Sequence, residues 1–414
     1  MISSTTKNTN KQYDIIILGS GMVGSALACA LADTNLRIAL LDKQKPQLDW
    51  PIDGYDLRVS ALTYASQKIL TYIGAWPEML KRRVTPFSKM SVWDASGNGK
   101  VEFNAEDSGV PHLGHIVENR VTQGALFDCI EKYKNIDYLQ PVTAIDVITD
   151  TDKIQLVLDD NSTLEAKLIV GADGARSWLR EQANIQISTK DYHQKGVVTM
   201  IKTQSHHQNT ARQRFLSTGP LAFLPLPDGH CSIVWSTSED EADRLVKLDE
   251  SSFIDELEAA LGESELGKIE SIGFRGAFPL KKQHADHYCA QRIVLVGDAA
   301  HTIHPLAGQG VNLGLLDIAT LAEEIISAIN KRRDIGSQSL LRRYERRRKG
   351  DNLLMMSSMD GFHALFSNDN KGLSLLRNIG LNMTNSINPL KSSLMAHAMG
   401  LDKKTPLADA QKYL

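Results

Sequence analysis

The sequence predicts an α/β protein of two domains with a helical C-terminal region. Its 414 residues exceed the usual size of a single domain. Residues 13–18 form an apolar run, as in a strand buried on both faces, and lead through a glycine-rich turn into helix-forming residues 25–32. Residues 188–282 instead contain alternating and β-rich stretches, such as 196–203 and 231–235, which predict a separate sheet over a cavity.

The composition narrows the function classes. Hydrophobic residues make up 42% of the chain and charged residues 23%, as in an ordinary globular protein. The formal net charge of -3 offers no attraction for nucleic acid, so we expect no nucleic-acid partner. The four cysteines are too far apart for a paired redox or zinc motif, which predicts four buried free thiols and no metal site.

Hydropathy bears on the cellular location. No apolar run is long enough to cross a bilayer, and residues 1–12 lack the apolar core of a secretory signal. We therefore expect a cytoplasmic protein whose contact with the inner membrane, where it makes one, is peripheral.

A first nucleotide-binding signal lies in the N-terminal strand, turn and helix. Gly19 would form the tight turn, Gly21 would let a pyrophosphate approach the backbone, and Gly24 would let the helix pack closely on the strand. The helix N-terminus then offers N–H groups to phosphate. A second strand over 36–41 ends at Asp42, whose carboxylate can accept hydrogen bonds from a ribose. The segment predicts a dinucleotide site, with a chance glycine turn as the alternative, and does not separate FAD from NAD.

Two further strands end in polar turns. The apolar strand at 168–171 runs into Asp173 and Gly174, and the strand at 292–296 runs into Asp298. Each turn alone also fits a simple helix cap or chain reversal. Together with the first motif they predict that three strand ends converge on one cofactor. The segment after Asp298 opens a helix and contributes the candidates His304, Pro305, Gly308, Gln309, Gly310, Val311 and Asn312.

These motifs, in this order, resemble the class A flavoprotein monooxygenases of the para-hydroxybenzoate hydroxylase type. The resemblance implies a Rossmann-like FAD-binding domain and a β-sheet substrate domain. It implies that the first motif binds the adenosine part of FAD, that the second serves both FAD and nicotinamide, and that the third binds the ribitol. Carried over to this sequence, the cofactor-binding residues are Gly19, Gly21, Gly24 and Asp42, then Asp173 and Gly174, then Asp298.

The resemblance narrows to the flavin hydroxylases of ubiquinone biosynthesis and extends over 13–401. Residues 56–62 are similar to that family's arginine segment near the flavin, and residues 112–119 to another shared segment. Residues 112–119, 177–180 and 341–346 favour the group that hydroxylates C5 of a 2-polyprenylphenol, with the C6 and C1 ring hydroxylases as alternatives. Further similar segments are 222–226, 231–235 and 297–314.

The family implies NAD(P)H as reductant, O2 as co-substrate and a lipophilic polyprenylphenol as substrate, whose ring attacks a flavin C4a-hydroperoxide. Residues 305–312 are then expected beside the isoalloxazine, where their N–H groups meet developing negative charge. His304 and Pro305 are the catalytic candidates, although a histidine here also fits a contact with backbone carbonyls. Arg58 and Arg120 are candidates for contacting the flavin or its phosphates, with ion pairs as the alternative.

The motif positions and the resemblance predict a discontinuous domain organisation. The FAD-binding domain is expected at 11–88, 112–187 and 283–335, the substrate domain at 89–111 and 188–282, and the C-terminal helical region at 336–414.

Two features of the C-terminal region bear on partners. A basic run fits a solvated face that pairs with acids, or alternatively attraction to an anionic membrane. An apolar stripe at helical spacing predicts a core or subunit contact, with a prenyl-chain contact as the alternative. We expect a homo-oligomer and association with other ubiquinone-biosynthesis proteins. The basic run is Arg342, Arg343, Arg346, Arg347, Arg348 and Lys349, and the stripe is Met355, Met359, Phe362 and Phe366.

Other classes of nucleotide-binding protein compete with this interpretation. A related halogenase would carry two tryptophans two positions apart, and a flavin disulfide reductase would carry two nearby cysteines; the sequence has neither pair. Two alternatives stay open. One is a non-catalytic scaffold that keeps FAD for stability, and the other is an NAD-linked dehydrogenase without flavin.

Overall fold

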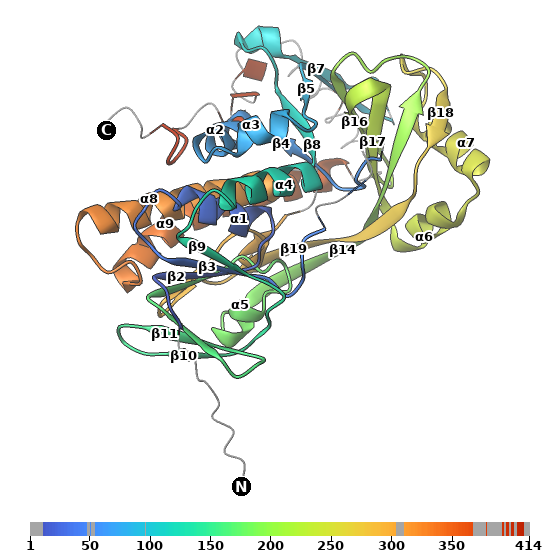
Figure 1. Cartoon of the computed structure of the whole chain (residues 1–414). Coiled ribbons are helices and arrows are strands. Elements are labelled where there is room, and N and C mark those ends of the chain that lie inside the picture. The colour runs from blue at the N-terminus through green and yellow to red at the C-terminus, as the bar shows by residue number, and fades with distance from the viewer. Residues whose placement is uncertain are drawn as a thin grey trace.

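The computed structural model describes residues 11–47, 50, 54–95, 97–303, 310–366, 378, 391–392, 395–396, 399–400 and 404–409. In Figure 1, a parallel sheet with helices above it forms one half of the molecule, and a larger sheet flanked by two helices forms the other. The helices are α1 Met22–Ala30, α2 Tyr64–Tyr72, α3 Ala75–Leu80, α4 Asn119–Ile130, α5 Trp178–Gln182, α6 Glu239–Lys247, α7 Glu250–Leu261, α8 Gly310–Asn330 and α9 Gln338–Phe366.

A six-stranded sheet carries the nucleotide-binding motifs. Its central strands are parallel and lie in the order β21, β13, β2, β3, β9, so the strands that precede the three predicted turns are direct neighbours. Since the carboxyl ends of parallel strands meet at one edge, the predicted convergence of the three strand ends is confirmed. The strands are β2 Ile15–Leu18, β3 Ile38–Leu41, β9 Ile136–Leu139, β13 Leu168–Gly171, β20 Cys289–Ala290 and β21 Ile293–Leu295.

The apolar run of β2 is buried on both faces, as its composition predicts. Ile15 and Ile17 pack into the core under α1, α4 and α8. Ile16 and Leu18 face a second core beneath a smaller sheet. Helix α1 begins three residues earlier than the sequence suggested, because the chain turns helical directly after Gly21. The smaller sheet consists of β1 Lys11–Gln12, β10 Ala144–Thr149, β11 Ile154–Leu158 and β12 Thr163–Ala166.

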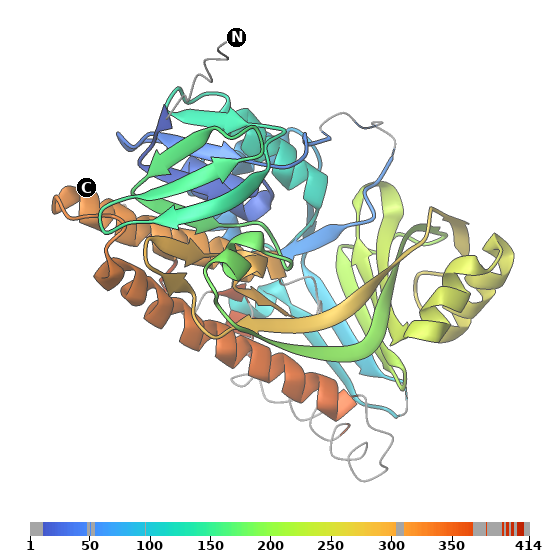
Figure 2. The same ribbon diagram turned by 90° about the horizontal axis from the view of Figure 1, so that it is seen from below.

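A nine-stranded sheet forms the other half of the molecule, and α6 and α7 cover its outer face (Figure 1). The long strands β14 and β19 run from this sheet back to the first half, as Figure 2 shows from below. The strands are β6 Lys89–Asp94, β7 Lys100–Asn104, β14 Ile187–Thr203, β15 Thr210–Leu216, β16 Gly219–Pro225, β17 His230–Ser238, β18 Ile269–Ile272, β19 Gly276–Ala285 and β22 His301–Thr302.

Two elements join the halves. A three-stranded sheet of β4 Val59–Leu62, β8 Gly114–Glu118 and β5 Thr85–Phe87 lies between them, with Ile116 in the core of the larger sheet and Val117 in the core under α1. Helix α9 runs along both halves (Figure 2). Its Tyr344 hydroxyl donates to the Leu295 carbonyl at 2.9 Å, and its Asp360 accepts from the Tyr192 hydroxyl at 2.5 Å.

The basic run on α9 is only partly a solvated face. Arg343 and Arg347 pair with Glu324 and Glu323 of α8, as the acid-pairing interpretation predicts. Arg348 departs from it, because its side chain is buried and pairs with a carboxylate inside the protein. In the apolar stripe Met355 and Met359 are partly buried against core residues; the side chains of Phe362 and Phe366 lie outside the described part.

The cysteines and the hydropathy give two further results. Cys29, Cys129, Cys231 and Cys289 are all buried and free, as their spacing predicts. Within the described ranges, no helix has the length and apolar character needed to cross a bilayer.

Candidate active site

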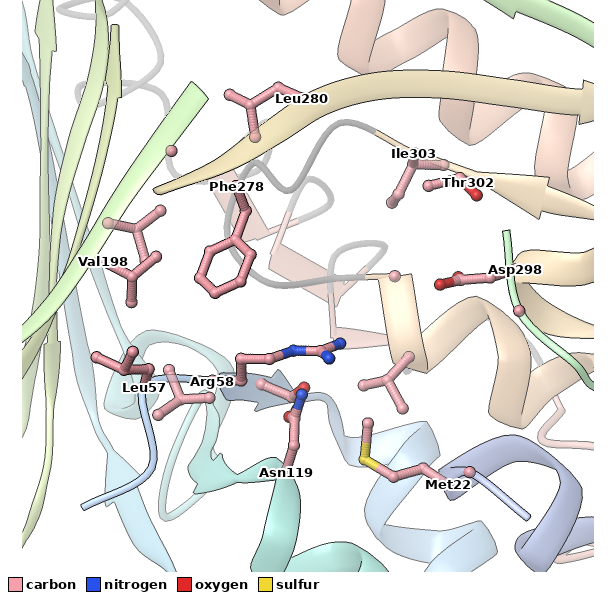
Figure 3. A pocket seen from close by; sticks show the side chains of 18 of the residues that line it. Met22, Leu57, Arg58, Asn119, Val198, Phe278, Leu280, Asp298, Thr302 and Ile303 are labelled. Atoms are coloured by element: carbon pink, nitrogen blue, oxygen red, sulfur yellow. The ribbon is translucent and has the colours of Figure 1, made fainter. Parts of the chain in front are cut away.

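A cavity of about 580 Å³ separates the strand ends of the six-stranded sheet from the inner face of the nine-stranded sheet (Figure 3). We call its two walls the cofactor side and the substrate side. The cofactor side includes Gly21, Met22, Val23, Arg58, Gly174, Asp298, Gly310 and Val311, and the substrate side includes Gly196, Val198, Gln213, Ala222, Leu224, Val234, Phe278 and Leu280.

The first glycine turn has the close contacts expected for a phosphate cradle. Gly19 has a φ of +99°, and a Cβ there would lie 2.4 Å from the Ala172 carbonyl oxygen. A Cβ at Gly24 would lie 1.9 Å from the Gly19 carbonyl oxygen, so α1 can pack this closely only without a side chain. A Cβ at Gly21 would meet nothing within 4 Å. The turn is therefore crowded at Gly19 and Gly24 but open at Gly21, next to the N-terminus of α1, which fits a pyrophosphate.

Asp42 lies beside this turn and holds it in place. Its Oδ2 accepts from the Ser20 backbone N–H at 2.8 Å and from the Ser20 hydroxyl at 2.7 Å. Its Oδ1 accepts from the Gln44 N–H at 3.0 Å. The carboxylate thus links the end of β3 to the glycine turn, and its contact with a ribose stays a prediction.

The second strand end uses its carboxylate as a cap. Asp173 accepts from the Ser177 hydroxyl at 2.5 Å and from the Leu179 N–H at 3.1 Å, which fixes the start of α5. The cavity is lined by Gly174, whose φ of +81° suits glycine. Arg180 of α5 then donates at 3.0 Å to the Ala299 carbonyl, tying this strand end to the third.

The third strand end places a carboxylate in the cavity. Asp298 lies in a short 3-10 turn over Gly297–Ala299, and its side chain points into the cavity opposite the Arg58 guanidinium (Figure 3). The side chain is accessible to solvent and lines the cavity. Desolvation by the surrounding protein raises the pKa of Asp298, against the lowering effects of His301 and Arg58. A carboxylate in this setting is suited to accept hydrogen bonds from a polyol.

A buried ionic network supports that turn from behind. Asp317 of α8 accepts from the Gly297 N–H at 3.1 Å and pairs with His301 at 2.5 Å. Its other oxygen accepts from Arg348 at 2.8 Å and from the Asn352 amide at 3.2 Å. Burial by itself would raise the pKa of Asp317, but the charges of His301 and Arg348 outweigh it and lower this pKa to about 2. The ionised carboxylate therefore anchors the turn that carries Asp298.

The two candidate arginines have different environments. Arg58 is exposed to the cavity and has its guanidinium there (Figure 3). Arg120 also lines the cavity, but it pairs with Glu118 at 2.8 Å and lies over the Trp50 ring at 5.0 Å. Of these two arginines, Arg58 is therefore the one whose guanidinium can reach a ligand without giving up an ion pair to another described residue.

Helix α8 starts at the cavity with Gly310 and Val311. Asn312 follows, and its amide is already occupied. It accepts from the Thr63 N–H at 3.1 Å and from the Ser66 hydroxyl at 2.6 Å, and it donates to the Ala61 carbonyl at 2.8 Å. Any contact between Asn312 and the cofactor thus falls to its backbone. The candidates His304, Pro305, Gly308 and Gln309 lie outside the described residues.

Comparisons with known proteins agree with this geometry. Residues 12–353 match the family described as an FAD binding domain. A ubiquinone hydroxylase of Rhodospirillum rubrum is 37% identical, with 97% of this chain and 92% of the relative covered. A 3-demethoxyubiquinol 3-hydroxylase of Escherichia coli is 35% identical, with 95% and 100% covered. The mitochondrial ubiquinone biosynthesis monooxygenase of Danio rerio is 35% identical, with 96% and 91% covered.

The chain belongs to the flavin hydroxylases of ubiquinone biosynthesis. As a member of this family it is an FAD-dependent monooxygenase that uses NAD(P)H and O2. The solved structure of p-nitrophenol 4-monooxygenase from Pseudomonas putida has the same fold, with a TM-score of 0.77 at 15% identity and coverage of 94% of this chain and 98% of that one.

The residues of the cofactor side fit FAD. The open space at Gly21 suits the pyrophosphate, and Asp298 suits the ribitol. The start of α8 at Gly310 offers backbone N–H groups to the isoalloxazine ring. Each assignment of a single residue stays a prediction.

The substrate side was missed by reasoning from the sequence. Val198, Leu280 and Phe278 point into the cavity from β14 and β19 (Figure 3), and Gln213 lines it from β15. No local motif marks these residues, because they come together only through strand pairing. The signal in the sequence was limited to the β-rich character of the segment.

Proposed function

We propose that this flavin hydroxylase acts on the aromatic ring of a polyprenylated phenol, and that it hydroxylates C5 of a 2-polyprenylphenol. The observation that carries the proposal is the shared cavity, in which an apolar sheet face lies opposite the Asp298 strand end. Apolar side chains such as Val198, Leu224 and Leu280 suit an aromatic ring with a prenyl tail.

The roles of the protein follow from the two walls. Bound FAD, reduced by NAD(P)H, supplies the activation of O2 that no side chain can provide. The glycine turn and Asp298 would hold the cofactor, and the apolar wall would orient the ring and keep water away from the reacting atoms. These roles need cavity shape more than acid–base residues.

The ring position requires its own experiment. The relatives are named for a ubiquinone hydroxylase and for a 3-demethoxyubiquinol 3-hydroxylase, and they are similarly close at 37% and 35% identity. Strains blocked separately at C5, C6 and C1 hydroxylation should be complemented with this chain, and the quinone intermediates identified by mass. We expect rescue of the C5 block; rescue of only the C6 or C1 block would refute the C5 assignment.

A measurement of catalytic turnover distinguishes an active hydroxylase from a non-catalytic scaffold that binds FAD. Purified holoprotein should oxidise NAD(P)H in response to a short-chain 2-polyprenylphenol and yield a product heavier by one oxygen. A scaffold that keeps FAD for stability would give no substrate-dependent oxidation.

We further propose a cytoplasmic protein that contacts the inner membrane peripherally and associates with itself and with other proteins of the pathway. The lipophilic nature of the proposed substrate supports the membrane contact, and the pairing of Arg343 and Arg347 with acids of α8 reduces what the basic run can contribute to it. Fractionation at low and high salt tests the membrane contact, and light scattering of the purified protein tests self-association.

A further inference from the structure

The substrate wall contains one amide within an apolar row of residues. Gln213 of β15 pairs with Ala222 of β16, Ala222 pairs with Val234 of β17, and Val234 pairs with Val198 of β14. All four residues line the cavity. Because side chains directly across paired strands share one face of a sheet, these four form a row across the wall. Gln213 is its polar member.

The direction of the Gln213 side chain follows from its neighbours in the strand. Arg212 pairs with Glu265 at 3.1 Å, and Arg214 donates to the Ala260 carbonyl at 2.8 Å, so both lie on the outer face under α7. Successive side chains in a strand alternate between faces. Gln213 therefore points inward.

The Gln213 side chain is buried beside the cavity. Gln213 is 8% exposed, and the exposed part faces the cavity. In the part of the chain that the structure describes, its side chain makes no hydrogen bond. Leaving a buried amide unpaired costs about 1–3 kcal/mol, so such a group is normally paired by whatever fills the cavity beside it.

We propose that the Gln213 amide binds an oxygen substituent on the substrate ring and thereby fixes which ring carbon faces the flavin. This inference rests on the proposed function. An amide suits the task because its oxygen accepts from a phenol O–H and its NH2 donates to a phenolate or methoxy oxygen. The apolar remainder of the row, Ala222, Val234 and Val198, offers the ring no other hydrogen bond, so this contact sets the rotation of the ring against the wall.

The test compares Gln213→Met with Val198→Ala from the same row. Gln213→Met keeps the length of the side chain but removes the hydrogen bond. With a short-chain 2-polyprenylphenol we expect kcat/KM to fall about tenfold, the size of one lost hydrogen bond. We also expect more NAD(P)H oxidised per product and hydroxylation at a second ring carbon. Val198→Ala should weaken substrate binding while keeping the product at one carbon.

FAD content and the melting temperature serve as folding controls for both variants. If Gln213→Met fails to fold, Gln213→Asn takes its place, since it keeps an amide but withdraws it by one methylene, and the same loss of regioselectivity is expected.

The outcomes separate the inference from the proposed function. If the wild type hydroxylates the phenol and folded Gln213→Met gives the same KM, coupling and product, the inference is wrong and the function stands. If the wild type does not turn over the phenol, the proposed function fails, and the inference fails with it.

Discussion

On the cofactor side of the cavity the chain presents backbone and glycine turns, whereas on the substrate side it presents side chains from paired strands. The cofactor side is built from strand ends that are adjacent in one parallel sheet, and its carboxylates mostly hold the protein itself, as Asp42 and Asp173 do. The substrate side is a row of small and apolar residues interrupted by Gln213. The cofactor side is therefore formed largely by local backbone turns, whereas the substrate side is formed by residues that are distant in sequence.

The largest effect is expected from the network behind the cofactor side. Asp317→Ala would remove the buried carboxylate that pairs with His301 and Arg348 and would leave Arg348, among the described residues, only its ion pair with Asp351 at 3.4 Å. Loss of one partner of a buried ion pair costs about 3–5 kcal/mol. We expect a lower free energy of unfolding in urea and a lower FAD content, because the turn carrying Asp298 loses its anchor.

Arg347→Met is the matched control for Asp317→Ala. Arg347 pairs with Glu323 and Glu324 on the same two helices, but the side chains of Arg347 and Glu323 are partly exposed, at 41% and 33%, and Glu324 keeps Arg343 as a partner. Such pairs contribute about 0–1 kcal/mol. An equal loss in both variants would show that burial of the network has no special importance.

The second prediction concerns the glycine turn. In Gly24→Ala the new Cβ meets the Gly19 carbonyl oxygen, so α1 must move away from the strand, at a cost of about 3 kcal/mol. Gly21→Ala should unfold at nearly the wild-type urea concentration, since its Cβ meets nothing, yet it should bind FAD more weakly because it occupies the space assigned to the pyrophosphate. Urea titration and the ratio of bound FAD to protein distinguish the two. Equal affinity for FAD in Gly21→Ala and the wild type would contradict the assignment of the pyrophosphate to this turn.

The third prediction tests the junction between the two sides. His115 of β8 is buried against Trp76 and His112, and burial, followed by the charge of His112, lowers its pKa from 6.5 to about 3. The unfolded chain takes up a proton near pH 6.5 and the folded chain does not. The stability that neutral His115 provides is therefore present above pH 6.5 and is lost as the pH falls toward 3. The loss is about 1.4 kcal/mol per pH unit, or about 2 kcal/mol at pH 5.

Urea unfolding of the wild type and of His115→Gln at pH 7 and pH 5 isolates this loss, because His112, His207 and His284, whose pKa values burial also lowers, are present in both proteins. His115→Gln should reduce the difference in the free energy of unfolding between pH 7 and pH 5. His206→Gln, at an exposed position, should leave that difference unchanged. A wild type that is equally stable at both pH values would contradict the prediction.

The cofactor side could be predicted well from the sequence because its signals are local. Gly19, Gly21 and Gly24 lie within six residues, and each apolar strand leads directly into its turn. The fold class and the adjacency of the three strand ends therefore follow from local signals, whereas FAD as cofactor followed from the family resemblance, because the glycine motif does not separate FAD from NAD. The hydrogen-bond partners of the individual side chains were harder to infer. Nothing near Asn312 in the sequence indicates that its amide is occupied by Thr63, Ser66 and Ala61.

The substrate side was hidden because strand register is not local. The segment Arg212, Gln213 and Arg214 reads as a polar stretch, and only pairing with β16 and β6 shows that the middle residue faces a cavity. Arg348 was misread for the same reason. Its place in a run of arginines suggested a solvated face, and only the approach of α8 shows that it is buried against Asp317.

The smallest effect is expected at the edge of the substrate side, where two phenylalanines provide a comparison. Phe278 and Phe274 are both exposed, at 42% and 79%, but only Phe278 is among the described residues that line the cavity, and its ring points inward beside Val198 (Figure 3). An aromatic contact contributes about 0.5–1.5 kcal/mol beyond its buried area. We therefore expect Phe278→Ala to lower kcat/KM for the phenol by about fivefold without changing the affinity for FAD, and Phe274→Ala to change neither quantity. Steady-state kinetics and fluorescence titration with FAD measure both. A residue that contacts only the substrate changes kcat/KM and leaves the affinity for FAD unchanged. If Phe278→Ala instead weakened FAD binding and left kcat/KM of the FAD-loaded enzyme unchanged, Phe278 would belong to the cofactor side.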